Sequence, residues 1–253
     1  MRARACTGRE RVVIRWIIWD IANTILHYHY ELVFQRLARL TGKEIPRIRH
    51  LIGGDYFTPG SLIYDADAGR IGRKKFIRLL RKRLGIDSRI PNKRLAWCFM
   101  DCFELPNATR TLLHFLADHY RMGIISNMNP VQWPHIRETF PTLHEDSGVF
   151  AFHVLSCRDK LVKPDLRIYA LAFGKACAQS EGALLPGECV FIDDREENVK
   201  AAEEFGMRAI LADESGPWGI ARNLADLGVL LPPADYYPPP VVPRVPSPIR
   251  GMA

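Results

Sequence analysis

A buried strand that stops on a carboxylate constrains this chain most. Residues 12–19 are β-branched, aromatic or aliphatic apart from Arg15 and have no helical period, so they predict a central strand covered on both faces. Asp20 follows at the carboxyl end of that strand, where open α/β sheets bind their ligands. The other interpretation is that Asp20 only caps the next turn, a common role for Asp. Segments further along the chain favour the first interpretation.

The size and composition of the chain indicate a substantial core. Of its 253 residues 47% are hydrophobic, enough for one large domain or a domain with a smaller inserted one. Six cysteines are scattered without a C-x-x-C pair and without a preceding secretory signal, so we expect reduced intracellular thiols. Residues 1–11 are basic and expected to be disordered, and the apolar run after them is too short to span a bilayer. We expect a soluble cytoplasmic protein that does not associate with membranes.

Residues 28–104 have a helical pattern and are expected to form an inserted cap. Helices are predicted over residues 31–40 and 72–84. Residues 28–100 hold 16 Lys or Arg against 6 Asp or Glu, a net charge of +10 in a chain whose total is +7. This charge indicates either a solvated helix face or a surface that attracts an anionic substrate or a polyanion. No nucleic-acid-binding motif accompanies the basic helix, so we do not expect nucleic acid as a partner.

Strands and helices alternate after the cap. Strands are predicted over residues 122–127, 149–156, 188–194 and 207–212, and helices over residues 109–120, 166–177 and 197–205. Pro164 is expected in the first turn of the second of these helices. Alternation of this kind predicts an α/β fold with a Rossmann-like parallel sheet. The core would comprise residues 12–27 and 105–231, and the proline-rich residues 232–253 would form a disordered tail.

Polar side chains follow several of these strands. Asp20, Ser126 and the pair Asp193–Asp194 come at strand ends, and Lys163 comes just before a predicted helix. Because the carboxyl ends of parallel strands meet at one edge of the sheet, we expect these side chains to converge. Carboxylate oxygens suit a hard cation such as Mg²⁺, and a hydroxyl, backbone N–H groups and a lysine suit phosphate oxygens.

These residues together resemble the motifs of the haloacid dehalogenase superfamily of hydrolases, over about residues 12–231. The position of the cap resembles the subgroup with a helical cap between the first two motifs. The cap segment of residues 65–71 with Phe76 is similar to that of sugar-phosphate phosphatases. The four motifs correspond to Asp20-Ile-Ala22-Asn-Thr24, Ile124-Ile-Ser126-Asn127, Lys163-Pro164-Asp165, and Asp193-Asp194 with Asn198 and Gly206.

The resemblance implies a Mg²⁺-dependent phosphatase of a small phosphorylated metabolite. Asp20 would attack phosphorus and form an aspartyl-phosphate that water then hydrolyses. Ser126 and Lys163 would join Asp20 as catalytic residues, and the cap would exclude water and select the substrate. The implied ligands of the metal are Asp20, the Ala22 carbonyl, Asp193 and Asp194, and the implied phosphate-binding residues are Thr24, Ser126, Asn127 and Lys163.

Ala22 departs from the family pattern, because the usual second aspartate of the first motif protonates the leaving group and activates water. Such catalysis contributes about 10²- to 10⁴-fold. One interpretation is a phosphatase with easily displaced leaving groups, or with His27 or a substrate hydroxyl as substitute acid. The alternatives are an inactive phosphate-binding or partner-binding module, a carbon–halogen hydrolase, which would leave Asp193 and Asp194 unexplained, and a phosphonoacetaldehyde hydrolase. The last would need a Schiff-base lysine from the cap, where Lys43, Lys74, Lys75, Lys82 and Lys93 are available.

Overall fold

The computed structural model describes residues 13–53 and 58–233. Its centre is a sheet of five parallel strands in the order β5-β4-β1-β6-β7. The α/β fold with a parallel Rossmann-like core is therefore confirmed. The strands are β1 Trp16–Trp19, β4 Arg121–Ser126, β5 Phe152–Leu155, β6 Cys189–Asp193 and β7 Arg208–Leu211.

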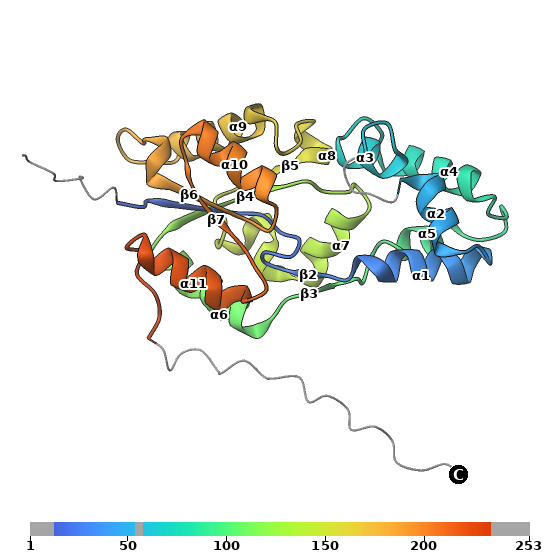
Figure 1. Cartoon of the computed structure of the whole chain (residues 1–253), viewed down its shortest axis with the longest axis horizontal. Coiled ribbons are helices and arrows are strands. Elements are labelled where there is room, and N and C mark those ends of the chain that lie inside the picture. The colour runs from blue at the N-terminus through green and yellow to red at the C-terminus, as the bar shows by residue number, and fades with distance from the viewer. Residues whose placement is uncertain (1–12, 54–57, 234–253) are drawn as a thin grey trace, which may run out of the picture.

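Strand β1 lies in the middle of the sheet and is buried on both faces. Ile17 and Trp19 join the apolar cluster that α6 and α11 cover, whereas Trp16 and Ile18 join the cluster that α9 and α10 cover. Figure 1 shows α9 and α10 on one side of the sheet and α6 and α11 on the other. The helices of this domain are α6 Asn107–Ala117, α7 Gln132–Thr139, α8 Ser156–Asp159, α9 Leu166–Ala178, α10 Glu196–Phe205 and α11 Gly216–Asp226.

Five helices form the cap, which extends from one end of the sheet domain (Figure 1). They enclose an apolar core of their own, in which Phe34 of α1 and Phe76 of α4 are fully buried. Two short antiparallel strands, β2 His27–Tyr28 and β3 Phe103–Glu104, join the cap to the sheet domain. The cap helices are α1 Tyr30–Thr41, α2 Ile45–Ile52, α3 Leu62–Asp67, α4 Arg73–Leu84 and α5 Asn92–Trp97.

Two sequence predictions need correction. The first strand is shorter than predicted, since regular pairing is confined to Trp16–Trp19, although Ile14 before it is buried. Pro164 is not in the first turn of a helix: α9 begins at Leu166, and the Asp165 side chain caps it by accepting from Arg167 N at 3.0 Å. The predicted disordered segments 1–11 and 232–253 lie outside the described residues, apart from residues 232 and 233. Within the described residues, no helix has the length and apolar character needed to cross a bilayer.

The cap meets the sheet domain at the end of α3. Asp67 Oδ1 accepts a hydrogen bond of 2.8 Å from Asn129 Nδ2, and the Asp67 carbonyl accepts one from Ser156 Oγ. Gly69 has a φ of 67°, and a Cβ there would lie 2.7 Å from the Cys157 carbonyl oxygen, so the two backbones approach too closely for a side chain. Burial raises the pKa of Asp67 to about 7, although the Asn129 hydrogen bond lowers it.

The Asp67 carboxyl should make the stability of the protein depend on pH. Its folded pKa of about 7 exceeds the ordinary value of 3.8, so the folded state binds more protons between these values. Stability is then lost as pH rises from about 4 to about 7, by up to about 1.4 kcal/mol per pH unit. Asp67→Asn removes this contribution, because the amide does not titrate. Urea unfolding of both proteins across this range should show their stability difference changing with pH, and parallel profiles would contradict the assignment.

Candidate active site

Three neighbouring strands bring the acidic and hydroxyl residues of the site together. In the register of the sheet, Trp19 of β1 lies beside Ile124 of β4 and Ile192 of β6. Asp20, Ser126 and Asp193 come next along these strands or two residues later, and all three are buried. The predicted convergence at the carboxyl edge of the sheet is thus present in the structure.

Lys163 links two of the carboxylates. Its Nζ lies 2.5 Å from Asp20 Oδ1 and 2.6 Å from Asp193 Oδ2, and it donates a third hydrogen bond of 3.2 Å to the Ile125 carbonyl. Asn127 orients the backbone of this lysine: Lys163 N donates to Asn127 Oδ1 at 2.9 Å, and Asn127 Nδ2 donates to Lys163 O at 3.1 Å. The side chain of Lys163 is only 2% exposed, so solvent does not compete for these contacts.

Burial and mutual charge interactions shift the pKa values of the ionisable groups in this cluster. Burial raises the pKa of Asp20 to about 7, and the charges of Asp193 and Asp194 add to this effect, while Lys163 opposes it. Burial also raises the pKa of Asp194, and Asp193 raises it further. Burial lowers the pKa of Lys163, but Asp193 and Asp20 outweigh this and bring it above its ordinary value. Lys163 therefore stays charged, and a cation bound beside Asp20 and Asp194 would favour their ionised forms.

Asp193 and Asp194 differ in what they contact. Asp193 accepts on Oδ2 from Lys163, and on Oδ1 from Arg195 N at 2.9 Å and from Asn198 Nδ2 at 2.8 Å. Both oxygens of Asp193 are thus engaged by the protein. Asp194 instead faces a cavity, where its Oδ2 accepts from Asn23 Nδ2 at 3.1 Å.

The cavity beside Asp20 has a volume of about 80 Å³. Asp20 and Asp194 in its lining have carboxylate side chains, and Ala22, also in the lining, has only its main-chain carbonyl as an oxygen ligand. No three or more His, Cys, Asp and Glu side chains of the described residues are grouped to hold a metal. A Mg²⁺ ion is nevertheless compatible with this set, because it is commonly held by one or two carboxylates together with water and phosphate oxygens. The full lining is Asp20, Ala22, Asn23, Tyr28, Asn127, Lys163, Asp194, Arg195 and Asn198.

Two hydroxyls at the same strand ends lack partners. Thr24 Oγ1 and Ser126 Oγ are buried, and neither forms a hydrogen bond within the described residues. A buried hydroxyl without a partner is costly, by about 1–3 kcal/mol in proteins. Neither residue is among the described residues that line the cavity beside Asp20, so the assignment of Thr24 and Ser126 to phosphate stays a prediction.

Tyr28 and Asn23 are site residues that the sequence interpretation missed. The Tyr28 ring stacks on Phe103 at 4.6 Å, and its hydroxyl accepts from Gln132 Nε2 at 2.9 Å. Asn23 has a φ of 56°, in the left-handed region that Asn tolerates better than most residues. The Asn at this position was the sequence signal for such a turn. Nothing in the sequence distinguishes Tyr28 from neighbouring aromatic residues.

Other candidates lie away from this cavity. His27 is exposed and does not line it, and neither do His114, His119 and His135. Lys163 is the one lysine among the described residues that line the cavity, and none of the five cap lysines considered for a Schiff base is among them. Asp67 is directed to Asn129 rather than to Asp20.

Two curated proteins are similar to this chain in sequence. The chain is 25% identical to "Phosphatase MT3486" of Mycobacterium tuberculosis (strain CDC 1551 / Oshkosh) over 219 residues, which are 85% of this chain and 95% of that protein. It is 29% identical to flavin mononucleotide hydrolase 1 of Arabidopsis thaliana over 133 residues, which are 52% of this chain and 49% of that one.

The fold is that of solved structures in the same superfamily. The HAD family enzyme bt-2542 of Bacteroides thetaiotaomicron, solved in complex with magnesium and inorganic phosphate, matches 78% of this chain and 93% of its own. The TM-score is 0.66 at 19% identity, a likeness of fold. The model of the family described as haloacid dehalogenase-like hydrolase matches residues 14–206, well over half of the chain. The chain therefore belongs to the haloacid dehalogenase-like hydrolases.

Proposed function

We propose that this hydrolase is a Mg²⁺-dependent phosphatase of a small phosphorylated metabolite, with Asp20 as nucleophile. The observation that carries the proposal is Asp20 itself, which is buried, accepts a hydrogen bond from Lys163 and lines a cavity together with Asp194. The printed names of two relatives, a phosphatase and a flavin mononucleotide hydrolase, support a phosphorylated substrate. The magnesium and phosphate complex of a structural neighbour supports the cofactor.

The geometry gives each oxygen of Asp20 a role. Oδ1 accepts from Lys163, so Oδ2 is the oxygen proposed to attack phosphorus. The Oδ2–P bond forms as the bond from phosphorus to the leaving oxygen breaks, and a water then attacks phosphorus, releases phosphate and regenerates the carboxylate. Ser126, Thr24 and the Asn127 N–H would bind the phosphate oxygens, while Lys163 holds Asp20 in position and offsets negative charge.

The metal would be held by Asp20, Asp194 and the Ala22 carbonyl. Bound Mg²⁺ supplies positive charge that offsets the repulsion between the Asp20 carboxylate and the phosphate. The sequence interpretation also placed Asp193 among the ligands. Because both Asp193 oxygens accept hydrogen bonds from the protein, we propose that Asp193 acts mainly by positioning Lys163 and the start of α10.

Ala22 shapes the choice of substrate. Among the described residues that line the cavity, Tyr28 provides the one hydroxyl, but phenols have an ordinary pKa near 10 and are weak proton donors at neutral pH. We therefore propose substrates whose leaving group needs little protonation, with Tyr28 rather than His27 beside the leaving oxygen. Sugar 1-phosphates belong in the screen because of the resemblance of residues 65–71 to sugar-phosphate phosphatases.

A second candidate function follows from Ala22 as well. Without an acid at this position, the chain would serve as a phosphate-binding module with little or no turnover. Metal-dependent binding of inorganic phosphate without hydrolysis of any acyl, aryl, sugar or alkyl phosphate would favour the module.

Asp20→Asn should reduce turnover by about 10³-fold or more, because an amide does not attack phosphorus. The folded state should be equally or more stable, since the buried Asp20 carboxyl has a raised pKa and its replacement removes an acid held in low dielectric. Steady-state assays with and without a chelator, together with thermal unfolding, measure both effects. Normal turnover in the variant, or turnover of the natural protein that ignores chelation, would reject the mechanism.

Ser126→Ala should weaken binding of inorganic phosphate in the presence of Mg²⁺ by about tenfold, since a hydrogen bond to a charged group is lost. It should cost little stability, because Ser126 Oγ has no protein partner in the described residues.

Ser156→Ala is the matched control, since Ser156 Oγ accepts from Met128 N at 2.8 Å and donates to the Asp67 carbonyl. It should lower stability by about 1–3 kcal/mol and leave the phosphate affinity unchanged. Calorimetric titration and urea unfolding separate the two variants. Equal phosphate affinities of Ser126→Ala and the natural protein would remove Ser126 from the site.

The rate should depend steeply on the acidity of the leaving group, because charge accumulates on an oxygen that receives no proton. Acyl and aryl phosphates should react faster than sugar 1-phosphates, and these faster than alkyl phosphates. Ala22→Asp should weaken the dependence of the rate on leaving-group acidity, because it restores an acid. Tyr28→Phe keeps the ring against Phe103 and should slow alkyl phosphates more than aryl ones. A flat series in the natural protein would point to a strong acid elsewhere.

A further inference from the structure

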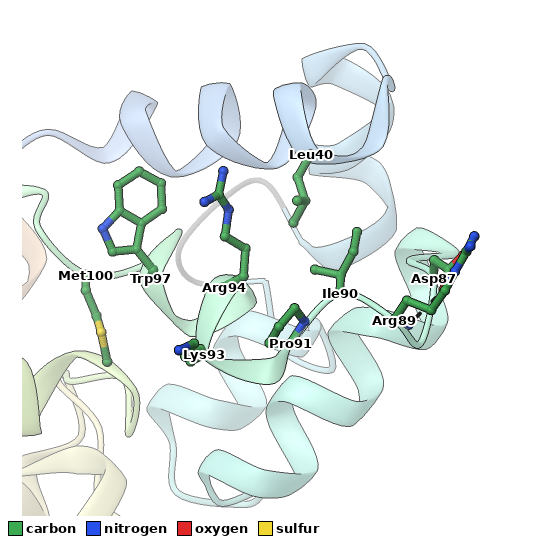
Figure 2. A pocket seen from close by; sticks show the side chains of 9 residues that line it. All are labelled: Leu40, Asp87, Arg89, Ile90, Pro91, Lys93, Arg94, Trp97 and Met100. Carbon is green, nitrogen blue, oxygen red and sulfur yellow. Dashed lines mark hydrogen bonds and ion pairs between the residues drawn. The ribbon is translucent and has the colours of Figure 1, made fainter.

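The cap carries a groove between α1 and α5 that the proposed reaction does not use. Its larger section, shown in Figure 2, is a cavity of about 1030 Å³. Leu40 from α1 and Ile90 from the opposite wall point toward each other across it. A second section of about 360 Å³ continues along α1 and shares Leu40, Arg94 and Trp97 with the first. The floor is apolar and consists of Leu40, Ile90, Pro91, Trp97 and Met100.

Trp97 is the anchor of this groove. Its side chain is 42% exposed, and no other Phe, Trp or Tyr of the described residues is in the exposed class. The guanidinium carbon of Arg36 lies 4.3 Å from the centre of its ring, and that of Arg94 lies 5.7 Å away. Exposed tryptophans and arginines are the residues that most often dominate binding energy at protein interfaces.

The rim of the groove is cationic and largely uncompensated. Arg39, Lys93 and Arg94 are exposed, and none of them forms an ion pair with a described residue. Among the described residues that line the two sections, the one acid is Asp87 of the larger section, and it is already paired with Arg89 at 2.6 Å. An occupant must therefore bring negative charge of its own.

We propose that this groove binds an acidic segment of a partner protein whose apolar side chains contact Trp97, Leu40 and Ile90. The two sections together exceed the roughly 300–1,000 Å³ of a small-molecule site, which favours a peptide segment over a metabolite. The floor has a single aromatic ring, that of Trp97, among aliphatic side chains, which favours peptide side chains over nucleic acid, because nucleic acid binds chiefly by stacking on several aromatic rings. A second copy of the chain would bring the same cationic groove and a net charge of +7, which disfavours it as the occupant.

The test uses the full chain and a fluorescein-labelled peptide with Glu and Leu at helical spacing. One comparison peptide replaces Glu by Lys, and another replaces Leu by Ala. The Glu/Leu peptide should bind at least about tenfold more tightly than either, as measured by fluorescence anisotropy. Trp97→Ala should weaken its binding by about 30-fold. Lys93→Glu with Arg94→Glu should weaken it similarly without removing a floor residue.

Lys74→Glu with Lys75→Glu is the matched control, because it makes the same charge change on exposed residues of α4. It should leave binding nearly unchanged, as should Asp20→Asn, which separates this proposal from the proposed activity. If the α4 control lost as much peptide affinity as Lys93→Glu with Arg94→Glu, the peptide would be attracted non-specifically to the basic cap, and the proposal would be overturned. Preferential binding of oligo-deoxythymidine, self-association through the groove, or peptide binding indifferent to Trp97→Ala would overturn it too.

Discussion

The bridge from Lys163 to Asp20 and Asp193 is the interaction on which the architecture of the site depends. It joins the loop before α9 to the ends of β1 and β6, with Nζ–O distances of 2.5 and 2.6 Å. Burying three charges is expensive, and such clusters are often less stabilising than apolar packing of the same volume. Their burial here fits a catalytic role, because the lysine fixes the orientation of Asp20 and the negative charge of the carboxylates would attract a cation.

Much of the fold and of this cluster follows from sequence. The apolar run ending at Asp20 and the alternation after residue 107 specify a parallel sheet, and residues that follow its strands must meet at one edge. Asp20, Ser126 and Asp193 are therefore predictable from local pattern alone. The exact start of β1 and the place of Pro164 are less so, since tertiary pairing and the Asp165 cap decide where regular structure begins.

The features that escaped prediction depend on contacts between distant segments. Tyr28 reaches the cavity because it stacks on Phe103, at the other end of the cap insertion. Asp67 turns to Asn129 because the end of α3 packs against α8, and no local pattern reports that packing. Likewise, the exposure of Trp97 depends on how α1 and α5 pack. The basic composition of the cap was visible in the sequence, but which of its charges surround an apolar floor was not.

The cap and the strand ends have different proposed roles, which are partner binding for the cap and the reaction for the strand ends. In the proposed function the strand ends would hold the nucleophile, the metal ligands and the phosphate contacts, whereas Ala22 would limit the rate with a poor leaving group. A missing acid slows the second step as well, because the same group ordinarily activates water. The covalent intermediate should therefore persist longer than in an enzyme with an acid at this position.

The most direct test of the central claim is acid quench of the protein with an acyl phosphate and Mg²⁺, followed by mass spectrometry of its peptides. If Asp20 is the nucleophile, the peptide that contains it should carry one phosphoryl group during turnover, and this group should be absent in Asp20→Asn. Turnover with no phosphoryl group on that peptide, or labelling of another residue that survives in Asp20→Asn, would contradict this role of Asp20.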